Sequence, residues 1–230
     1  MSGERPDPGR GVFETLLLAG GRVHALEAHL QRLDGSVRQL YGMSVPEPAR
    51  TRLVDTLTGA ARVGAERRAR IDAAPRDGQL DLRLVLAQAP AGRPVALAPV
   101  VVPGGLGAHK WQDRRLVERP GEHPVPLIVD EDGSVLEAAW ANVWMLEGDC
   151  LITPPADGRL LPGVTRARLL RLAPHLGLHP REEPIRLADA RAARTIFLTS
   201  SLRLAVPASF DPHPQESPAV DRIRDALACC

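Results

Sequence analysis

Residues 11–33 read GVFETLLLAGGRVHALEAHLQRL, an apolar run that ends at a glycine pair and is followed by a helical repeat. Gly11 to Ala19 has the composition of a buried strand, and Gly20-Gly21 provides the turn that ends it. From Leu26 to Tyr41 apolar residues recur every three or four positions, which predicts an amphipathic helix that ends at Gly42. A strand followed directly by such a helix indicates an α+β domain.

The remainder of the first hundred residues adds the other elements of this domain. A second helix is expected to begin after Pro46 to Pro48 and to run to about Val63. Alternating leucines from Leu80 to Leu86 predict a half-buried strand, and the apolar run from Val95 to Val102 predicts another. The sequence therefore predicts two helices packed on a sheet, in a small N-terminal α+β domain that spans residues 1–103.

Residues 104–230 are predicted to form a second, larger domain of mixed β structure that carries the chain's lysine. The boundary is placed at Pro103 to Ala108, PGGLGA, because this is the most glycine-rich stretch in mid-chain. Beyond it, Asp132-Gly133 and Gly148-Asp149 are expected to be hairpin turns. The expected elements are strands at Leu127–Asp130, Val135–Glu137, Asn142–Leu146 and Thr195–Leu198, and helices at Val164–Leu176 and Asp221–Leu227.

The composition argues against several classes of partner. With 29 basic and 28 acidic residues the formal net charge is +1, which leaves no basic footprint for a nucleic acid. The first residues, MSGERPDP, lack the features of a signal peptide, and no apolar run approaches the length of a membrane span. We therefore expect a cytoplasmic protein that acts on a small molecule, without a nucleic acid or membrane partner.

Metal and nucleotide motifs are missing from the sequence as well. The three cysteines, Cys150, Cys229 and Cys230, lack the spacing of a metal site, and the seven histidines include no HExxH. The glycine-rich signatures of dinucleotide and nucleoside triphosphate sites do not occur either. We expect no metal and no nucleotide cofactor.

The chain contains a single lysine, Lys110, because 28 of its 29 basic residues are arginine. A guanidinium stays protonated, whereas a lysine amine can lose its proton and act as a nucleophile or a base. Lys110 could therefore form an imine with a carbonyl cofactor or substrate. The alternative is that a lone lysine is a chance result of an arginine-rich composition.

A lysine-bound pyridoxal phosphate (PLP) would need an acid against its pyridine nitrogen, so that the ring can accept electrons. Glu137, in SVLEAAWANVW (residues 134–144), is a candidate for this acid. The alternative is an exposed strand residue. Asn142, the only asparagine of the chain, could orient the acid or the ring hydroxyl, or could simply be a turn residue of the hairpin.

The phosphate of such a cofactor would need backbone N–H groups at a helix start, hydroxyls and an arginine. LPGVTR (residues 161–166) places Val164 and Thr165 at the start of a predicted helix, although Thr165 could also cap that helix without any ligand. Thr199-Ser200-Ser201 is a second hydroxyl-rich turn. Arg32 could supply the positive charge, or could be a solvated residue of its helix.

In their order along the chain, these segments resemble the fold type IV family of PLP-dependent enzymes, the class IV aminotransferases. This family contains branched-chain and D-amino-acid transaminases and 4-amino-4-deoxychorismate lyase. GVFETLLLAGGRVHALEAHLQRL is similar to its first strand and helix, and AHKWQDRRLVE (residues 108–118) to its lysine segment. VLEAAWANVW, LPGVTR and FLTSSLRLAVP (residues 197–207) are similar to its acid strand, phosphate turn and closing strand. The resemblance implies a two-domain fold, PLP in the cleft between the domains, and a homodimer.

The resemblance also assigns residues. Lys110 would bind PLP covalently and carry a proton, and Glu137 would pair with the pyridine nitrogen. The remaining cofactor contacts would come from Arg32, Asn142, Val164, Thr165, Ser201 and the backbone of Leu202. After the strand from Leu80 to Leu86, many members carry an Arg-Gly pair where this chain has Ala87-Gln88-Ala89. The candidates for substrate binding are therefore Phe13, Arg93 and Arg203.

Within the family, SSLRLAVP (residues 200–207) is similar to the closing turn of the lyases. We therefore expect a lyase that converts 4-amino-4-deoxychorismate to 4-aminobenzoate and pyruvate, the chemistry of folate biosynthesis. Lys110, or a hydroxyl such as that of Thr15, would deliver a proton to the departing enolpyruvyl group. The alternatives are an amino-acid transaminase with the same cofactor and a non-catalytic relative.

Overall fold

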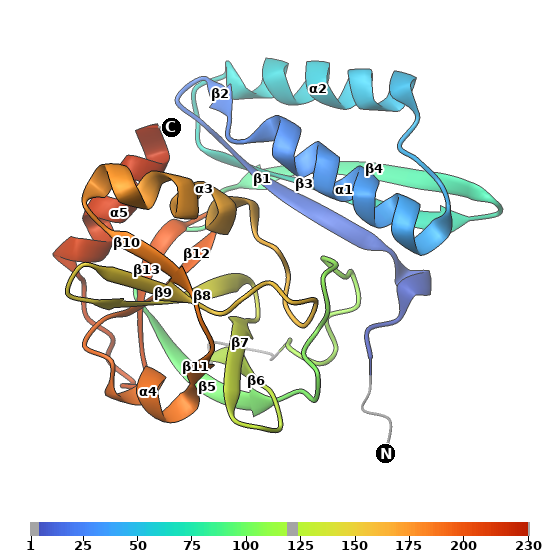
Figure 1. Ribbon diagram of the computed structural model, residues 1–230. Helices are drawn as coiled ribbons and strands as arrows, with labels where there is room; N and C mark the ends of the chain where they lie inside the picture. Colours follow the sequence, from blue (N-terminus) through green and yellow to red (C-terminus); the bar gives the residue numbers. More distant parts are fainter. Residues whose placement is uncertain (1–4, 119–123, 230) are drawn as a thin grey trace. The chain divides into compact units, whose positions relative to one another are not determined.

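The chain forms two compact units, each described here by itself. The structure, a computed structural model, describes residues 5–118 and 124–229 (Figure 1). The first four residues of MSGERPDP, His123 and Cys230 lie outside the described residues. Residues 5–90 and 109–115 make up the N-terminal unit, and residues 91–108 and the chain from Leu116 onward make up the C-terminal unit.

The N-terminal unit is a four-stranded sheet with two helices on one face (Figure 1). The strands lie in the order β2-β1-β3-β4, and β1 pairs with β2 and β3, and β3 with β4, in antiparallel fashion. The elements are the 3-10 helix η1 (Pro8–Arg10), β1 (Val12–Ala19), β2 (Arg22–Val23), α1 (Leu26–Tyr41), α2 (Glu47–Ala61), β3 (Arg67–Arg76) and β4 (Gln79–Gln88).

Side chains alternate between the two faces of this sheet, which explains what the helices cover. Leu16 of β1 and Ile71 of β3 are completely buried and pack with Leu33 of α1 in one apolar core. Because successive strand residues point to opposite faces, Phe13 of β1 and Arg70 of β3 lie on the other face of the sheet. One face of the sheet therefore holds the apolar core, and the other face carries Phe13 and Arg70.

The C-terminal unit is built on a nine-stranded sheet in the order β10-β9-β8-β12-β13-β5-β6-β7-β11. An additional pairing of β7 with β8 closes six of these strands into a ring, so the centre of the unit is a small barrel. The strands are β5 (Val95–Val101), β6 (Val125–Val129), β7 (Ser134–Ala138), β8 (Ala141–Glu147), β9 (Cys150–Thr153), β10 (His179–Glu182), β11 (Ile185–Arg186), β12 (Ile196–Ser200) and β13 (Leu204–Ser209).

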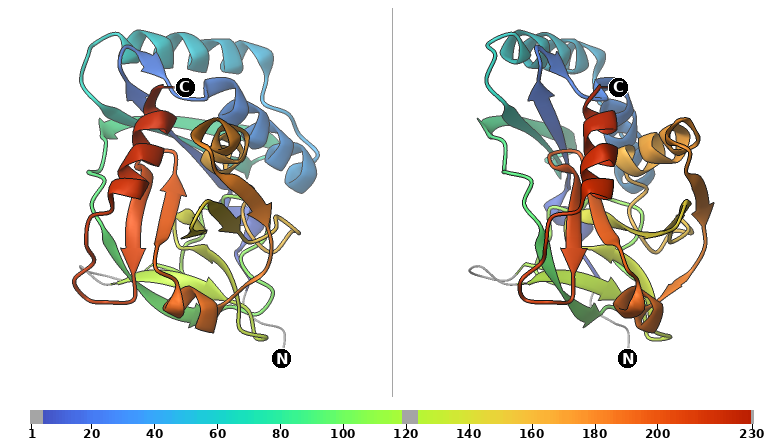
Figure 2. Two further views of the ribbon diagram at one scale, coloured as in Figure 1. Left: turned by 60° about the vertical axis from the view of Figure 1, so that its left-hand side comes forward. Right: turned by 90° about the vertical axis from the view of Figure 1, so that its left-hand side faces the viewer.

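Helices cover part of this barrel. They are α3 (Val164–Leu172), the 3-10 helix η2 (Ala173–Leu176), α4 (Leu187–Ala192) and α5 (Pro218–Cys229). The last helix, α5, runs beside β13 (Figure 2). Arg168 of α3 donates through Nη2 to the carbonyl of Leu227 in α5 at 2.7 Å, which joins these two helices.

Most of the predicted elements are present, and the main omission is β3. Helix α1 has the predicted bounds, and α2, β4, β5, β6, β7, β8 and β12 lie within a few residues of their predicted positions. The prediction missed β3 because its sequence, RRARIDAAPR, carries four arginines and has only one large apolar residue, Ile71, at its alternating core positions. The strands β2, β9, β10, β11 and β13 and helix α4 were also missed, and the predicted helix to Leu176 changes to a 3-10 turn at Ala173.

The division into units differs from the predicted boundary at residue 103 in two places. Strand β5 pairs with β6 and β13, so it belongs to the C-terminal unit. The segment 109–115, which includes Lys110, belongs to the N-terminal unit because it pairs with the start of β1. The chain thus passes into the C-terminal unit at residue 91, returns at His109 and leaves again at Leu116.

Candidate active site

Backbone hydrogen bonds hold the lysine segment against β1 in the N-terminal unit. The N–H of Phe13 donates to the carbonyl of Lys110 at 2.8 Å, and the N–H of Gln112 donates to the carbonyl of Gly11 at 2.9 Å. Gly11 has φ +95°, and a Cβ at this position would collide with the carbonyl of Ala73. A glycine is therefore needed where the lysine segment meets the strand.

The side chain of Lys110 lies over the ring of Phe13. Its Nζ is 4.8 Å from the ring centroid, and the Cζ of Arg70 is 3.9 Å from the same centroid. Phe13 is only 8% exposed, so its ring is a buried platform for two cations. Arg70 in turn donates through Nε to Oδ1 of Asp72 at 2.7 Å, which balances one of the two charges.

Thr15 lies beside this platform. It is two residues from Phe13 on β1, so both side chains point to the same face, and it is the direct cross-strand partner of Arg70. The face of the sheet opposite to α1 and α2 therefore carries an amine, an aromatic ring, a hydroxyl and a guanidinium. This is a set that can bind an anionic substrate and move a proton.

The residue before Lys110 is fixed to α1. Nδ1 of His109 lies 3.0 Å from Oγ of Ser36, and the His109 ring meets the Trp111 ring edge to face with centroids 5.2 Å apart. Burial lowers the pKa of His109. These contacts restrict the backbone on both sides of Lys110.

Arg32, the predicted phosphate ligand, is part of a buried triad on the helix face of the sheet. Its Nε and Nη2 donate to the two carboxylate oxygens of Glu14 at 2.7 and 2.8 Å, and Nδ1 of His29 lies 2.8 Å from Oε2. Burial alone would raise the pKa of Glu14, but Arg32 and His29 outweigh it and bring the pKa to about 2. Burial lowers the pKa of His29, so a neutral imidazole donates its Nδ1–H to the carboxylate. Arg32 is therefore a fixed cation rather than a solvated one.

In the C-terminal unit, Glu137 and Asn142 bracket one residue of the loop before α3. Glu137 on β7 faces Asn142 on β8 directly across the ladder, and each side chain is 5% exposed. The N–H of Leu161 donates to Oε2 of Glu137 at 3.3 Å, and Nδ2 of Asn142 donates to the carbonyl of Leu161 at 2.9 Å. Glu137 is therefore not an exposed strand residue, and Asn142 is not a turn residue of the hairpin.

The start of α3 is the predicted phosphate turn. Gly163 is its N-cap, and among the described residues no side chain caps this end, so the capping role considered for Thr165 does not apply. Val164 and Thr165 are buried at 8% and 3% exposure. A Cβ on Gly163 would collide with Oδ1 of Asn142, so the turn and Asn142 fit each other only with glycine. Uncapped backbone N–H groups at a helix start form an anion site.

The closing turn between β12 and β13 is held by hydrogen bonds of its own hydroxyl groups. The hydroxyl of Thr199 accepts a hydrogen bond from Nε1 of Trp144 at 2.9 Å and is completely buried. Oγ of Ser200 accepts from the N–H of Arg203 at 3.3 Å. Ser201 and Leu202 lie in the turn itself and are half-buried.

The two arginines predicted for substrate binding differ in their surroundings. The guanidinium of Arg203 stacks on Trp140, with Cζ 4.3 Å from the ring, and its Nε donates to the carbonyl of Ala91 at 3.2 Å. Burial lowers the pKa of Arg203, although a guanidinium stays protonated. Arg93 lies exposed between β4 and β5, and it forms no ion pair within residues 5–118 and 124–229.

Sequence reasoning missed Arg70, Glu14 and His29. Arg70 and its partner Asp72 were missed together with β3, although Ala69, Ile71 and Ala73 alternate with them and could have revealed the strand. Glu14 lies in an apolar run, where a charged residue signals a buried ion pair.

The residues of the two units fit PLP as judged by their own chemistry. One unit offers a lysine on an aromatic platform, and the other offers a buried carboxylate and an uncapped helix start. In the described part of the chain no group of three or more metal-ligating side chains occurs. No helix of that part is long and apolar enough to cross a membrane.

Comparisons with known proteins agree with this chemistry. The family model of class IV amino-transferases matches residues 11–126 and 109–209. A bifunctional aminodeoxychorismate lyase / D-amino acid transaminase of Mycobacterium tuberculosis is 30% identical over an alignment of 235 residues, gaps included. The alignment covers 86% of this chain and 80% of the relative. An aminodeoxychorismate lyase of Bacillus subtilis is 28% identical over 224 residues, 86% of this chain and 76% of the relative.

Solved structures show the same fold. The PLP-bound form of a hypothetical aminotransferase from Mycobacterium tuberculosis matches with a TM-score of 0.81 at 25% identity, over 96% of this chain and 88% of that chain. The predictions of a two-domain α+β fold of type IV and of PLP as the family's cofactor are thereby confirmed. The chain belongs to the class IV aminotransferase family of PLP-dependent enzymes.

Proposed function

We propose that this protein is a PLP-dependent lyase that converts 4-amino-4-deoxychorismate to 4-aminobenzoate and pyruvate. The observation that carries the proposal is the position of Thr15. Its hydroxyl lies on the same sheet face as Phe13, whose ring supports the Lys110 amine. A lyase of this kind needs a proton donor for its leaving group in addition to the base that starts the reaction, and the amine and the hydroxyl can divide these two tasks.

The cofactor ligands that we propose are those that the family resemblance assigns. Lys110 is the covalent anchor, and the carboxylate of Glu137 keeps the pyridine nitrogen protonated, with Asn142 beside it on β8. The N–H groups of Val164 and Thr165 bind the phosphate together with Arg32, Ser201 and the backbone of Leu202. When bound, PLP supplies an electron sink for the carbon that bears the substrate amine.

The chain's own residues account for the proton balance of the reaction. The amine of Lys110 takes the proton from the carbon that bears the substrate amine. The bond between the substrate's ring carbon and the enolpyruvyl oxygen then breaks, and the substrate ring becomes aromatic. Lys110 then gives a proton to the methylene carbon of the departing group, or Thr15 gives it and regains a proton from Lys110, and the group leaves as pyruvate. One proton is removed and one is returned, so the reaction needs no oxidant or reductant.

The substrate carries two carboxylates, and arginines are the residues suited to them. Arg70 is the first candidate, because its guanidinium shares the Phe13 ring with Lys110. Arg203 is the second, because it is half-buried on Trp140, three residues after Glu137. Substrate binding by Arg93 is a proposal that rests on the sequence alone. We also propose that the ring of Phe13 contacts the substrate. A homodimer and a role in folate biosynthesis also remain proposals that rest on the family resemblance.

The second candidate function is an amino-acid transaminase with the same cofactor and the same Lys110. It is favoured by the name of the Mycobacterium tuberculosis relative, which combines both activities in one chain. In a transaminase the proton returns to the cofactor, so no separate donor to a leaving group is needed, and Thr15 would have no catalytic task. A non-catalytic relative is the third candidate.

One set of assays separates these candidates. The PLP-loaded protein is incubated with 4-amino-4-deoxychorismate and, separately, with D-alanine or a branched-chain amino acid plus 2-oxoglutarate. The proposal expects 4-aminobenzoate and pyruvate in equal amounts in the first assay. Amino transfer without 4-aminobenzoate would instead identify a transaminase. If PLP produces no visible absorbance that depends on Lys110, the protein is non-catalytic.

A further inference from the structure

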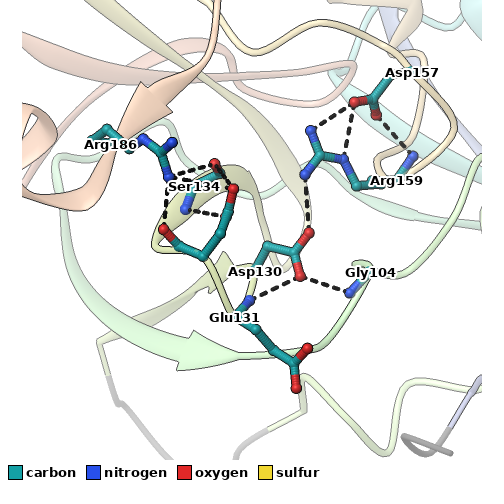
Figure 3. A network of polar contacts seen from close by, with 8 residues as sticks. Gly104, Asp130, Glu131, Ser134, Asp157, Arg159 and Arg186 are labelled. Atoms are coloured by element: carbon teal, nitrogen blue, oxygen red, sulfur yellow. Dashed lines mark hydrogen bonds and ion pairs between the residues drawn. The ribbon is translucent and has the colours of Figure 1, made fainter.

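A network of charged side chains in the C-terminal unit connects the loop after β5 to the loop before α3 (Figure 3). Arg159 donates through Nε and Nη2 to Oδ2 of Asp157 at 2.9 and 2.7 Å, and through Nη1 to Oδ2 of Asp130 at 2.9 Å. The other oxygen of Asp130 accepts from the N–H groups of Gly104 and Glu131, both at 2.8 Å. One arginine therefore joins three segments of backbone.

The backbone of Arg159 adds a further link. Its carbonyl accepts from the N–H of Gly107 at 3.1 Å. Gly105 has φ +69°, and a Cβ there would collide with the same carbonyl. The glycine-rich loop from Gly104 to Gly107 thus approaches Arg159 more closely than a chain with side chains could.

This junction lies next to the residues assigned to the cofactor. Leu161, two residues after Arg159, is held by Glu137 and Asn142. Gly163, four residues after Arg159, is the N-cap of α3. Three residues after Gly107 the chain reaches Lys110. The position of Arg159 therefore influences where the helix start presents its N–H groups.

We propose that Arg159 and Asp130 are positioning residues for the phosphate of the cofactor, because they fix the loop that leads into the α3 N-terminus. The proposal rests on the proposed function, since it assumes that PLP binds at this helix start. The side-chain hydrogen bonds of Arg159 and Asp130 join these two residues to each other and to Asp157, Gly104 and Glu131. They act through the backbone of residues 159–161.

The network is more than an ordinary surface ion pair. The side chains of Arg159 and Asp130 are 33% and 15% exposed, and the contact of Arg159 with Asp157 uses two nitrogens. The hydrogen bond from Gly104 and the contact with Arg159 lower the pKa of Asp130, and the two aspartates raise the pKa of Arg159. Charged hydrogen bonds of this kind hold a loop more firmly than exposed pairs do.

The experiment compares cofactor affinity in the apo forms of the full chain. Arg159→Met removes all of the side-chain contacts. Asp130→Asn keeps an oxygen for Gly104 but places a neutral group against Arg159, so it tests the proposal even if Arg159→Met does not fold. Arg186→Met is the matched control, because Arg186 contacts Asp132 and Ser134 in the same unit but not the loop before α3 (Figure 3).

Each protein is titrated with PLP and with pyridoxal, which lacks the phosphate. We expect Arg159→Met and Asp130→Asn to weaken PLP binding by about tenfold, the scale of one lost charged hydrogen bond. Pyridoxal binding should change much less, and Arg186→Met should leave both affinities as in the wild type. In the apo protein, the amides of Gly107 and Leu161 should exchange hydrogen faster in Arg159→Met than in Arg186→Met.

Two results would overturn the inference. One is an unchanged PLP affinity in folded Arg159→Met and Asp130→Asn, and the other is an equal loss for PLP and pyridoxal. Failure of the PLP site itself gives a different result, because the wild type would then bind PLP no better than pyridoxal, or would bind it independently of Lys110. Failure of the lyase assignment alone is seen in the product assays and leaves these affinities unchanged.

Discussion

At the scale of single residues, Thr15 is where the lyase and the transaminase differ. Thr15→Val keeps the shape of the side chain but removes the hydroxyl. If this hydroxyl protonates the leaving group, kcat for 4-aminobenzoate formation should fall by about a hundredfold, the size of one lost acid catalyst. Thr15→Ser should retain most of the activity, and the affinity for PLP should stay the same in both. Full lyase activity in Thr15→Val would rule out the assigned role.

Substitution of Glu14 should lower the free energy of unfolding. Glu14→Gln leaves the guanidinium of Arg32 buried without its carboxylate partner, and breaking a buried ion pair in this way costs about 3 kcal/mol of unfolding free energy. Urea unfolding of the apo protein measures this difference. Glu27→Gln breaks an exposed pair with Arg50 and is the control. An equal effect of both variants would mean that the Glu14 pair is no stronger than a surface contact.

The same carboxylate predicts a dependence on pH. The pKa of Glu14 is about 2 in the folded protein and lies below its ordinary value of 4.5, so the folded state binds fewer protons between these values. Its contribution is complete above the unfolded pKa and is lost as the pH falls through the folded one. The stability difference between wild type and Glu14→Gln should therefore be smaller at about pH 3 than at about pH 6. A constant difference would show that Glu14 is not the titrating group.

At the scale of secondary-structure elements, the sequence was informative where side chains follow a clear period. Leucines at helical spacing gave α1 with its final bounds, and the predicted glycine turns lie between β6 and β7 and between β8 and β9. Strand β3 was not recognised, because charged residues alternate with its core residues, which are only two alanines and one isoleucine. This omission hid Arg70, so a missed strand became a missed site residue.

The N-terminus of α3 depends on a glycine. A methyl group on Gly163 would overlap Oδ1 of Asn142, so Gly163→Ala must displace either the phosphate turn or Asn142. We expect a loss of about 2 kcal/mol in stability from overpacking, together with weaker PLP binding. Gly35→Ala is the matched control, because Gly35 lies within α1 and nothing within 4 Å would meet its Cβ. It should raise stability slightly. Thermal unfolding and PLP titration of both variants measure this contrast.

At the scale of the whole molecule, the order of chemical groups could be predicted from the sequence, but their surroundings could not. The lysine, the acid strand and the helix start were each located by residue type and by resemblance. Which unit holds each group depends on long-range pairings, such as that of Trp111 with Val12, and no local pattern encodes these. The partners of Arg32 and Arg159 were missed for the same reason, since Glu14 and Asp130 are distant from them in sequence.

The lone lysine gives the whole chain a direct test. Borohydride reduction in the presence of PLP should add one pyridoxyl phosphate to each chain, on Lys110, as measured by mass spectrometry of the intact protein and of its peptides. Lys110→Arg keeps a cation over Phe13 but has no nucleophilic amine, and its chain contains no lysine at all. It should take up no adduct and should lose lyase activity while its apo form remains folded. PLP at about a hundred times its Kd should stabilise the wild type by about 2.7 kcal/mol, and Lys110→Arg by clearly less. An adduct of the same yield on Lys110→Arg would place the reactive amine at the chain terminus and remove Lys110 from the mechanism.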